Sequence, residues 1–536
     1  MARAVLLYLL LLAGLSQPAT AREVVVASAP SHISVTVYRD PDRAAGAKLD
    51  PDFPQGFALI SETRSVTLPP GESTIRFEGV AEGMVAVSAI VTGLPGGTLE
   101  KNRNADLLSP AALVDGTLGN RVTLTRTNPA TGVTTPENAI VRTRADGGLV
   151  LQTHEGYEAV RCSGLPEKLT FHGVPAGLSA RPVFSIDTRD ADGGTYQVVL
   201  TYISWGFDWQ AHYVATLAGD APRGKVGLKL RSWLSLVNDN GENFPDAELL
   251  AVAGRLNVTS DFRRLASPPQ ARPLRLTCYP LGSTSAGTPV PAPAPPPMLR
   301  QPMALSAYRA KAADEAAPVM ELAGAPAMMA REEALGDLKL YRIPEPVTVA
   351  SRGMKQVAFL DKDKVEGEFE YRAACSPYAY GEKFAPMRMW LTTVNDEAHG
   401  LGAALPMGGA SVFAPSSHGE LLVGEPSLRD YADGQDVELE LANSTNVFAL
   451  CAKQSADNPD DVGAPWIAMR ALLSNANTHP VKVRLALGSS GQWKVQAAGK
   501  GLSVKDGQWV LERTIPAGEA TRLEWEVRRS AEDVVE

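Results

Sequence analysis

Few residues in this chain of 536 amino acids have the types and spacing that a catalytic site needs. Ser417, His418 and Glu420 place a hydroxyl, an imidazole and a carboxylate within four positions. The members of a nucleophilic triad normally converge from different segments, so this cluster is more typical of an exposed turn. The sequence also lacks the G-x-S-x-G, H-E-x-x-H, phosphate-loop and dinucleotide-binding patterns. We therefore expect no catalytic residues, and the sequence alone reveals neither a reaction nor a ligand.

Metal ligands are equally hard to find. His212 lies in a predicted strand, where a hydrogen-bonded histidine is favoured over a ligand because no convergent partners can be named. Asp239, Glu242 and Asp246 could bind calcium together with backbone oxygens, but their spacing fails the EF-hand pattern and suits a turn. The same interpretation applies to three further acidic residues: Asp457, Asp460 and Asp461. We expect neither a metal nor a cofactor.

Three aromatic residues could instead form a stacking platform for a sugar. Trp205, Trp209 and Tyr213 share one parity, so a strand would turn them to the same face. Large aromatic side chains are more often buried with their polar tip hydrogen-bonded. The alternation therefore favours a place in the core.

The strands that would position these residues are strongest between Tyr196 and Val258. Lys225, Lys229 and Arg231 alternate there with apolar side chains, which indicates one buried and one solvated face. The alternating apolar residues are Val226, Leu228, Leu230, Leu234 and Leu236. Asn238–Gly241 supplies residues that tolerate positive φ, which predicts a turn between two antiparallel strands. The stretch is typical of the centre of an antiparallel sheet.

Composition excludes two classes of partner. Hydrophobic residues make up 44% of the chain and charged residues 21%, which is ordinary for a soluble globular protein of two to four domains. The formal net charge is −9, and the sequence has no cluster of Lys and Arg. Nucleic acid and anionic lipid surfaces are therefore not expected partners.

The first 21 residues resemble a secretory signal peptide. Arg3 precedes an apolar run over residues 4–15, and Ala19–Ala21 offers a small-x-small cleavage site. The run is too short to span a bilayer, and no later segment is apolar enough for a transmembrane segment. We expect an exported protein, periplasmic or extracellular after cleavage near Ala21.

Four cysteines fit an oxidising compartment. They are Cys162, Cys278, Cys375 and Cys451. An even count suggests two disulfides, and three pairings are possible. We favour Cys162–Cys278 and Cys375–Cys451, since each bond then closes within one half of the chain. Buried free thiols are the alternative.

The order of segments predicts an all-β protein. A signal peptide (1–21) precedes an N-terminal antiparallel sheet (22–105). Short strands between Gly-containing turns suggest a small SH3-like, barrel-like module (106–183). Strands return over 184–278 and again over 336–536, where turn spacing resembles a β-sandwich. The Pro/Ala-rich tract between them (279–335) has too few large apolar side chains to order itself, and would normally mark a domain boundary.

Several pieces, in this order, resemble one family of secreted bacterial proteins. WQAHY at Trp209–Tyr213, WLSLVNDNG at Trp233–Gly241 and FPDAELLAVAG ending at Gly254 carry the resemblance, and LYRIPEPVTVASRGMKQVAFL at Leu340–Leu360 continues it. The loop around Leu405, Pro406, Gly408 and Gly409, the LLVGEP segment and SVTVYR near the start also match. The family shares a C-terminal domain of unknown function with the mucoidy-inhibitor-A-like proteins.

The resemblance implies that residues 279–335 are a flexible insertion within one large β domain over 184–278 and 336–536. It also implies that the matching residues are structural, because the family brings no catalytic residues: Trp209, Tyr213, Trp233, Asn238, Gly241, Gly254, Leu405, Pro406 and Gly408. One departure is that many relatives carry a long coiled coil where this chain has the small β module.

These patterns favour a non-enzymatic binding or scaffolding module of the cell envelope, with an envelope protein or glycan as partner. One alternative is a hydrolase of envelope polysaccharide or peptide, which would need paired carboxylates about 5–10 Å apart in a cleft. Another is a carbohydrate-binding module, which would need exposed tryptophans.

Overall fold

The computed structural model describes residues 22–530, with gaps at 45, 105–106, 129, 145–148, 160–167, 176–177, 219–223, 255, 267–328 and 460–464. Nearly all of its regular structure is β-strand, which confirms the all-β class. The helical elements of the described residues are short: η1 (Ala86–Ser88), α2 (Pro110–Gly116) and α3 (Phe262–Ala266). None of the helices in these ranges is long and apolar enough to cross a membrane. The expected signal peptide, Cys162 and Cys278 fall outside the described ranges.

Two sheets contain the N-terminal strands. The N-terminal sheet runs β1 (Glu23–Val26), β4 (Gly71–Glu78), β12 (Val183–Asp190) and β6 (Glu100–Asn104). The middle sheet runs β17 (Arg331–Leu335), β18 (Leu338–Arg342), β16 (Phe244–Ala253), β2 (His32–Tyr38), β3 (Phe57–Leu68), β13 (Gly194–Trp205) and β5 (Ile90–Thr92), with β19 (Val347–Val349) also on β16. Hydrogen-bonded ladders thus cross the expected boundaries at residues 105 and 183, and β17 takes up the last five residues of the expected insertion.

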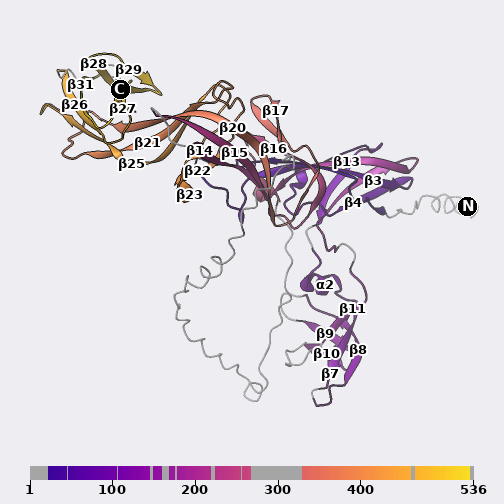
Figure 1. The fold of residues 1–536 in the computed structure, drawn as a ribbon. Coiled ribbons are helices and arrows are strands. Elements are labelled where there is room, and N and C mark those ends of the chain that lie inside the picture. The colour runs from indigo at the N-terminus through magenta and orange to yellow at the C-terminus, as the bar shows by residue number, and fades with distance from the viewer. Residues whose placement is uncertain are drawn as a thin grey trace, which may run out of the picture.

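A third sheet, here called the long sheet, forms most of the rest. Its order is β23 (Gly419–Gly424), β22 (Gly408–Ser416), β14 (Phe207–Ala218), β15 (Lys225–Asn238), β20 (Gly353–Ala374), β21 (Ala385–Val394), β25 (Asp436–Lys453), β26 (Ile467–Asn475), β31 (Ala520–Arg529) and β28 (Trp493–Ala497). Off this path, β24 (Ser427–Leu428) pairs with β22, β27 (Val481–Ser489) pairs with β20, and β30 (Gln508–Ile515) joins β27 to β29 (Leu502–Lys505). Figure 1 shows this sheet extending to the C-terminal end of the molecule.

The alternation between Tyr196 and Val258 suggested the centre of one sheet. The structure instead divides this stretch between two sheets. β13 and β16 belong to the middle sheet, whereas β14 and β15 belong to the long sheet. Asn238–Gly241 therefore does not join two paired strands. It carries the chain from one sheet to the other, and Gly206 (φ 89°) does so before β14. Strong alternation shows only that each strand has one buried face. Successive strands can bury that face within one sheet or in two sheets that pack against each other.

The described residues form three separate hydrophobic cores, two of them among these layers. The first core lies among the N-terminal, middle and long sheets and includes Trp209, Tyr213 and Leu234. The second core is formed by strands of the C-terminal half, among them β26, β27 and β31. A disulfide between Cys375 and Cys451 joins β25 to the residue after β20 at this core, with a Cα–Cα distance of 5.4 Å. One of the two favoured cysteine pairings is therefore present.

The small β module is an open sheet. Its strands are β10 (Gly156–Ala159), β9 (Val150–Thr153), β8 (Thr134–Val141), β7 (Arg121–Thr127) and β11 (Lys168–Phe171), in that order. In the described residues β10 and β11 are its edges, so the expected barrel does not close. Val122, Leu124 and Leu151 form its own core. Figure 1 shows the module projecting from the layered sheets.

Gly408 offers a test of the pairing between β14 and β22. A Cβ atom at Gly408 would lie 2.0 Å from the carbonyl oxygen of Ala211, which no rearrangement of side chains can relieve. We expect Gly408→Ala to lower the free energy of unfolding by about 1–3 kcal/mol or more in urea titration. Gly409→Ala is the matched control, because its Cβ would meet only the His212 ring, at 3.8 Å. Equal unfolding midpoints for the two variants would contradict this pairing.

The disulfide provides a second test. Replacing both Cys375 and Cys451 by alanine removes a cross-link between residues 76 positions apart. The unfolded C-terminal half then gains conformational freedom, and we expect a loss of about 2–4 kcal/mol in the free energy of unfolding. Mass spectrometry of a non-reduced digest should find the two cysteine peptides linked. Recovery of both as unlinked peptides would refute the bond.

Candidate functional site

The residues that carry the family resemblance converge in the first core. Trp209 and Tyr213 are fully buried, and their rings pack edge-on against Tyr341 and Phe359 respectively. Trp209 Nε1 donates to the carbonyl oxygen of Val252 at 3.1 Å, and Tyr213 Oη donates to that of Pro406 at 2.7 Å. Leu405 is buried nearby. Trp209 and Tyr213 therefore have no exposed face with which to stack on a sugar.

The remaining motif residues hold turns and close contacts. Asn238 Nδ2 donates to the carbonyl oxygens of Glu242 and Ala350, which fixes the crossing between the sheets. Gly241 N donates to Glu82 Oε2 at 3.1 Å. Gly254 has φ 113°, a conformation that favours glycine.

The polar clusters noted in the sequence lie mostly at turns, as far as the structure describes them. Ser417 Oγ lies 3.0 Å from His418 Nδ1, but both side chains and Glu420 are exposed at the turn between β22 and β23. Asp239 accepts from Arg352, and Asp246 lies within β16, at an irregularity of its pairing with β19, with φ 48°. Asp457 is exposed, and Asp460 and Asp461 lie outside the described ranges. No group of three His, Cys, Asp or Glu side chains among the described residues could hold a metal ion.

A different site arises where β20 changes its neighbour. On one side of β20, the ladder with β15 ends at the pair Lys225–Glu368, and the ladder with β27 begins at the pair Lys482–Glu370. Between these two strands a cavity of about 720 Å³ opens beside β20. We call it the charged cavity, because its wall includes Lys225, Glu366, Glu368, Glu370, Asp436, Glu438, Lys482, Arg484 and Lys505.

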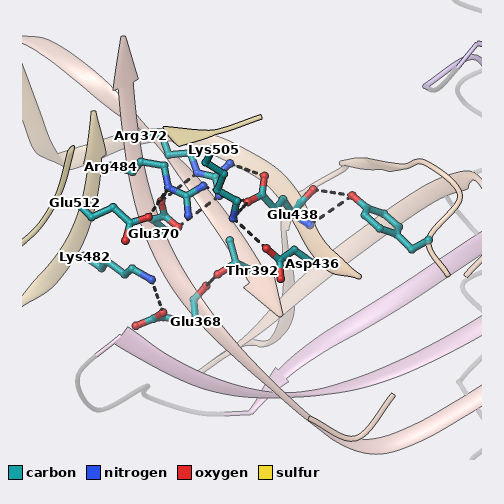
Figure 2. A network of polar contacts seen from close by, with 11 residues as sticks. Glu368, Glu370, Arg372, Thr392, Asp436, Glu438, Lys482, Arg484, Lys505 and Glu512 are labelled. Carbon is teal, nitrogen blue, oxygen red and sulfur yellow. Dashed lines mark hydrogen bonds and ion pairs between the residues drawn. The ribbon is translucent and has the colours of Figure 1, made fainter. Parts of the chain in front are cut away.

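Most of these charges are already paired, as Figure 2 shows. Arg372, which lies behind the wall, donates from both Nη atoms to the Glu438 carboxylate at 2.8 Å, a bidentate geometry. Arg484 Nη1 and Lys505 Nζ lie 3.2 and 3.1 Å from Glu438 Oε1. Arg484 Nε lies 2.6 Å from Oε1 of Glu370, a side chain with 1% exposure. Buried Glu370 and half-buried Glu438 are thus each matched by a guanidinium.

This network keeps Glu438 ionised. The hydrogen bonds from Arg372 lower the pKa of Glu438 to about 2, although burial acts in the opposite direction. Burial also acts to lower the pKa of Lys505, but hydrogen bonds to Asp436 and Glu438 outweigh it and the pKa is raised. Glu438 is therefore a hydrogen-bond acceptor over the ordinary pH range and holds no proton to donate.

Part of the cavity wall remains open to a ligand. Lys225 and Glu366 are exposed side chains on neighbouring strands, with Gly227 directly opposite Glu366. A Cβ at Gly227 would meet only the Ala218 side chain, at 3.7 Å, so no close contact requires glycine. Glycine inside a strand lowers stability, and here its effect is to leave space beside two opposite charges.

A histidine lies at the same cavity. His399 Nδ1 lies 2.7 Å from Asp396 Oδ1, and the hydrogen bond to His399 lowers the pKa of Asp396. Thr393, another wall residue, donates its hydroxyl to the carbonyl oxygen of Glu366 at 2.6 Å.

Sequence reasoning missed this cavity. Its strongest signal is the alternation of Glu366, Glu368, Glu370 and Arg372 with apolar or small residues. That alternation predicts a strand with one charged face, which is ordinarily a solvated face. The partners on β25, β27 and β29 lie 66 or more positions later, and no local pattern brings them together.

Comparisons with known proteins assign no family. No protein-family model matches the chain, and no curated protein matches it. The resemblance described above therefore rests on the motif residues alone.

The Glu438 network can be tested by stability. Glu438→Gln keeps the shape but leaves Arg372, Arg484 and Lys505 under-compensated, and we expect a loss of about 2–3 kcal/mol in urea unfolding at neutral pH. The folded-state pKa is depressed, so this contribution is present above pH 4.5 and is lost as the pH falls through about 2. The difference in unfolding free energy between wild type and Glu438→Gln should therefore narrow as the pH falls from 4.5 to about 2.

The matched control for this prediction is Glu440→Gln. Glu440 lies on the same strand but is exposed, with a 3.4 Å ion pair to exposed Arg388. We expect a change below about 0.5 kcal/mol. Equal losses for Glu438→Gln and Glu440→Gln would contradict the role of half-buried Glu438 in the ion-pair network.

Proposed function

We propose that this chain is an exported, non-enzymatic binding module that holds a segment of an envelope partner in the charged cavity. The observation that carries the proposal is the cavity itself: about 720 Å³, at the junction of two cores, with exposed Lys225 two positions before Gly227 and exposed Glu366 directly opposite Gly227. That volume lies within the roughly 300–1,000 Å³ of small-molecule and side-chain sites.

The ligand expected from this wall carries both signs of charge. Five carboxylates stand against four Lys or Arg side chains around the cavity, so neither sign dominates. Lys225 would pair with an acidic group of the ligand and Glu366 with a basic group. A polypeptide segment with neighbouring acidic and basic side chains meets this requirement, and complementary charges would set its orientation.

Export is part of the proposal. The N-terminal pattern of residues 1–21 supports it, and the Cys375–Cys451 disulfide is compatible with an oxidising compartment. The motif resemblance to secreted bacterial β proteins supports the same location. We propose membership of that group on these motifs.

A hydrolase is the second candidate, and His399 favours it. Its contact with Asp396 is the kind that orients a general base. Glu438, with its pKa near 2, could not supply the general acid that glycoside cleavage requires. If the chain hydrolyses envelope polymers, His399→Ala should abolish that activity. If the wild type binds an envelope polymer without cleaving it, the non-enzymatic binding function is favoured.

The binding proposal is tested by capture of partners in the producing cells. Tagged wild type and variants are crosslinked in the envelope, and the captured molecules are quantified by mass spectrometry. We expect Lys225→Glu to reduce the main captured partner at least 10-fold, because the new carboxylate repels the acidic group of the ligand. High salt should also reduce capture by the wild type, because it screens the attraction between the ligand and the charged wall.

The control for this experiment is Lys229→Glu. Lys229 has the same charge and lies on the same face of β15, but it is not part of the cavity wall. Capture should remain close to that of wild type. A partner captured equally by wild type and Lys225→Glu would contradict the proposal.

A further inference from the structure

We propose that a second cavity, on the outer face of the long sheet, binds an uncharged saccharide unit. Its volume is about 450 Å³. Four neighbouring strands, β22, β14, β15 and β20, form its floor with Gly409, Ser411, Gln210, His212, Ser235 and Gln356. We call it the neutral cavity. It is separate from the charged cavity and does not depend on the function proposed there.

Strand register brings the floor residues together. Gln210 lies opposite Ser235, which in turn lies opposite Gln356, and His212 lies opposite Gly409. Alternation turns these side chains away from the first core, into which the intervening residues point. The result is a continuous row of hydrogen-bonding groups across the sheet. Gln356 Nε2 donates to Ser235 Oγ at 3.1 Å, which fixes one end of the row.

The wall of the cavity is held in place by specific contacts. Leu49 N donates to Gln210 Oε1 at 2.8 Å, and Gln210 Nε2 donates to the carbonyl oxygen of Ala47 at 3.0 Å. Arg43, at the base of the same loop, forms a buried ion pair with Asp208 and donates to the carbonyl oxygen of Trp209. A wall anchored in this way is formed before a ligand arrives, which lowers the entropic cost of binding.

The chemistry of the floor suits an uncharged polyhydroxylated ligand. Hydroxyl, carboxamide and imidazole groups each offer donors and acceptors, as the hydroxyl groups of a sugar do. The charged wall residues Lys48 and Glu425 are exposed and opposite in sign, so the cavity has little net charge. The charged cavity differs in this respect, because carboxylates and cations dominate its wall.

Trp233 lies next to two floor residues of the neutral cavity, although it is not itself part of the cavity lining. It is half-buried, lies opposite His212 in the β14–β15 ladder, and precedes Ser235 by two positions on the same face. An indole ring can pack against the apolar face of a sugar ring while hydroxyl groups bond to the floor. This aromatic residue is not the Trp209 and Tyr213 pair, which is buried.

Gly409 keeps the floor open. It lies inside β22, its backbone has no positive φ, and a Cβ would meet only His212 Nδ1, at 3.8 Å. Neither backbone conformation nor packing requires glycine at this position, although strand glycines lower stability. A larger side chain would therefore fill the cavity next to His212 without displacing the sheet.

The test is calorimetric titration of the purified full chain with three uncharged tetrasaccharides: maltotetraose, cellotetraose and tetra-N-acetylchitotetraose. We expect at least one to bind wild type with a dissociation constant below about 10 mM. Gly409→Leu should weaken that binding at least 10-fold, and Gln356→Ala and Trp233→Ala should each weaken it about 5-fold. Gly227→Leu, which fills the charged cavity instead, should leave it unchanged.

Folding is checked by near-UV circular dichroism and the urea midpoint. If Gly409→Leu does not fold, Gln356→Ala takes its place, because this side chain is exposed and hydrogen-bonds to the floor residue Ser235. The proposal is overturned if none of the three tetrasaccharides binds wild type, or if folded Gly409→Leu binds as tightly as wild type. Weakening by Gly227→Leu would also overturn it, since the saccharide would then occupy the charged cavity. Loss of partner capture in Lys225→Glu with intact saccharide binding would separate the two sites.

Discussion

One strand, β20, belongs to both main cores, and this constraint decides where the charged cavity lies. Its first part pairs with β15 beside the first core, and its last residues pair with β27 beside the second. Backbone hydrogen bonds of a single strand therefore fix the two cores relative to each other. The charged cavity opens where the neighbours change, and its wall includes Glu366, Glu368 and buried Glu370.

Charge compensation is the second recurring feature. In the long sheet Glu438 pairs with Arg372 and Glu370 with Arg484, and in the middle sheet buried Glu62 pairs with Arg64. Burying a carboxylate without such a partner would cost several kcal/mol, and pairing mainly offsets that cost rather than adding stability. What the pairs contribute is geometry. They hold the wall of the charged cavity in one arrangement and leave only its exposed members to a ligand.

The all-β class followed from alternation, because period-2 patterns such as that from Val226 to Leu236 have no helical reading. The burial of Trp209 and Tyr213 followed from the same pattern, but Trp205, which the pattern grouped with them, is only half-buried and lies on β13. Sheet membership did not, since Asn238–Gly241 suits a hairpin and a crossing between sheets equally well. Neither cavity could be predicted: Gln210 and Gln356, like Glu370 and Arg484, are far apart in the chain, and only register brings them together. In the sequence, a strand glycine such as Gly227 indicates only lower strand stability, and nothing in the pattern shows that it borders a cavity.

The parallel ladders also constrain how the chain can fold. Ser34 pairs with Glu248 in the middle sheet, and Ala211 pairs with Gly408 in the long sheet. Contacts between such distant residues must wait for loop closure over long segments, so topology of this kind folds slowly. In the described residues, β2 lacks its second neighbour until β16 has been made, and β14 lacks its second neighbour until β22 has been made. During synthesis the early strands therefore expose unpaired edges for a long time, a state that is prone to aggregation and that chaperones would have to protect.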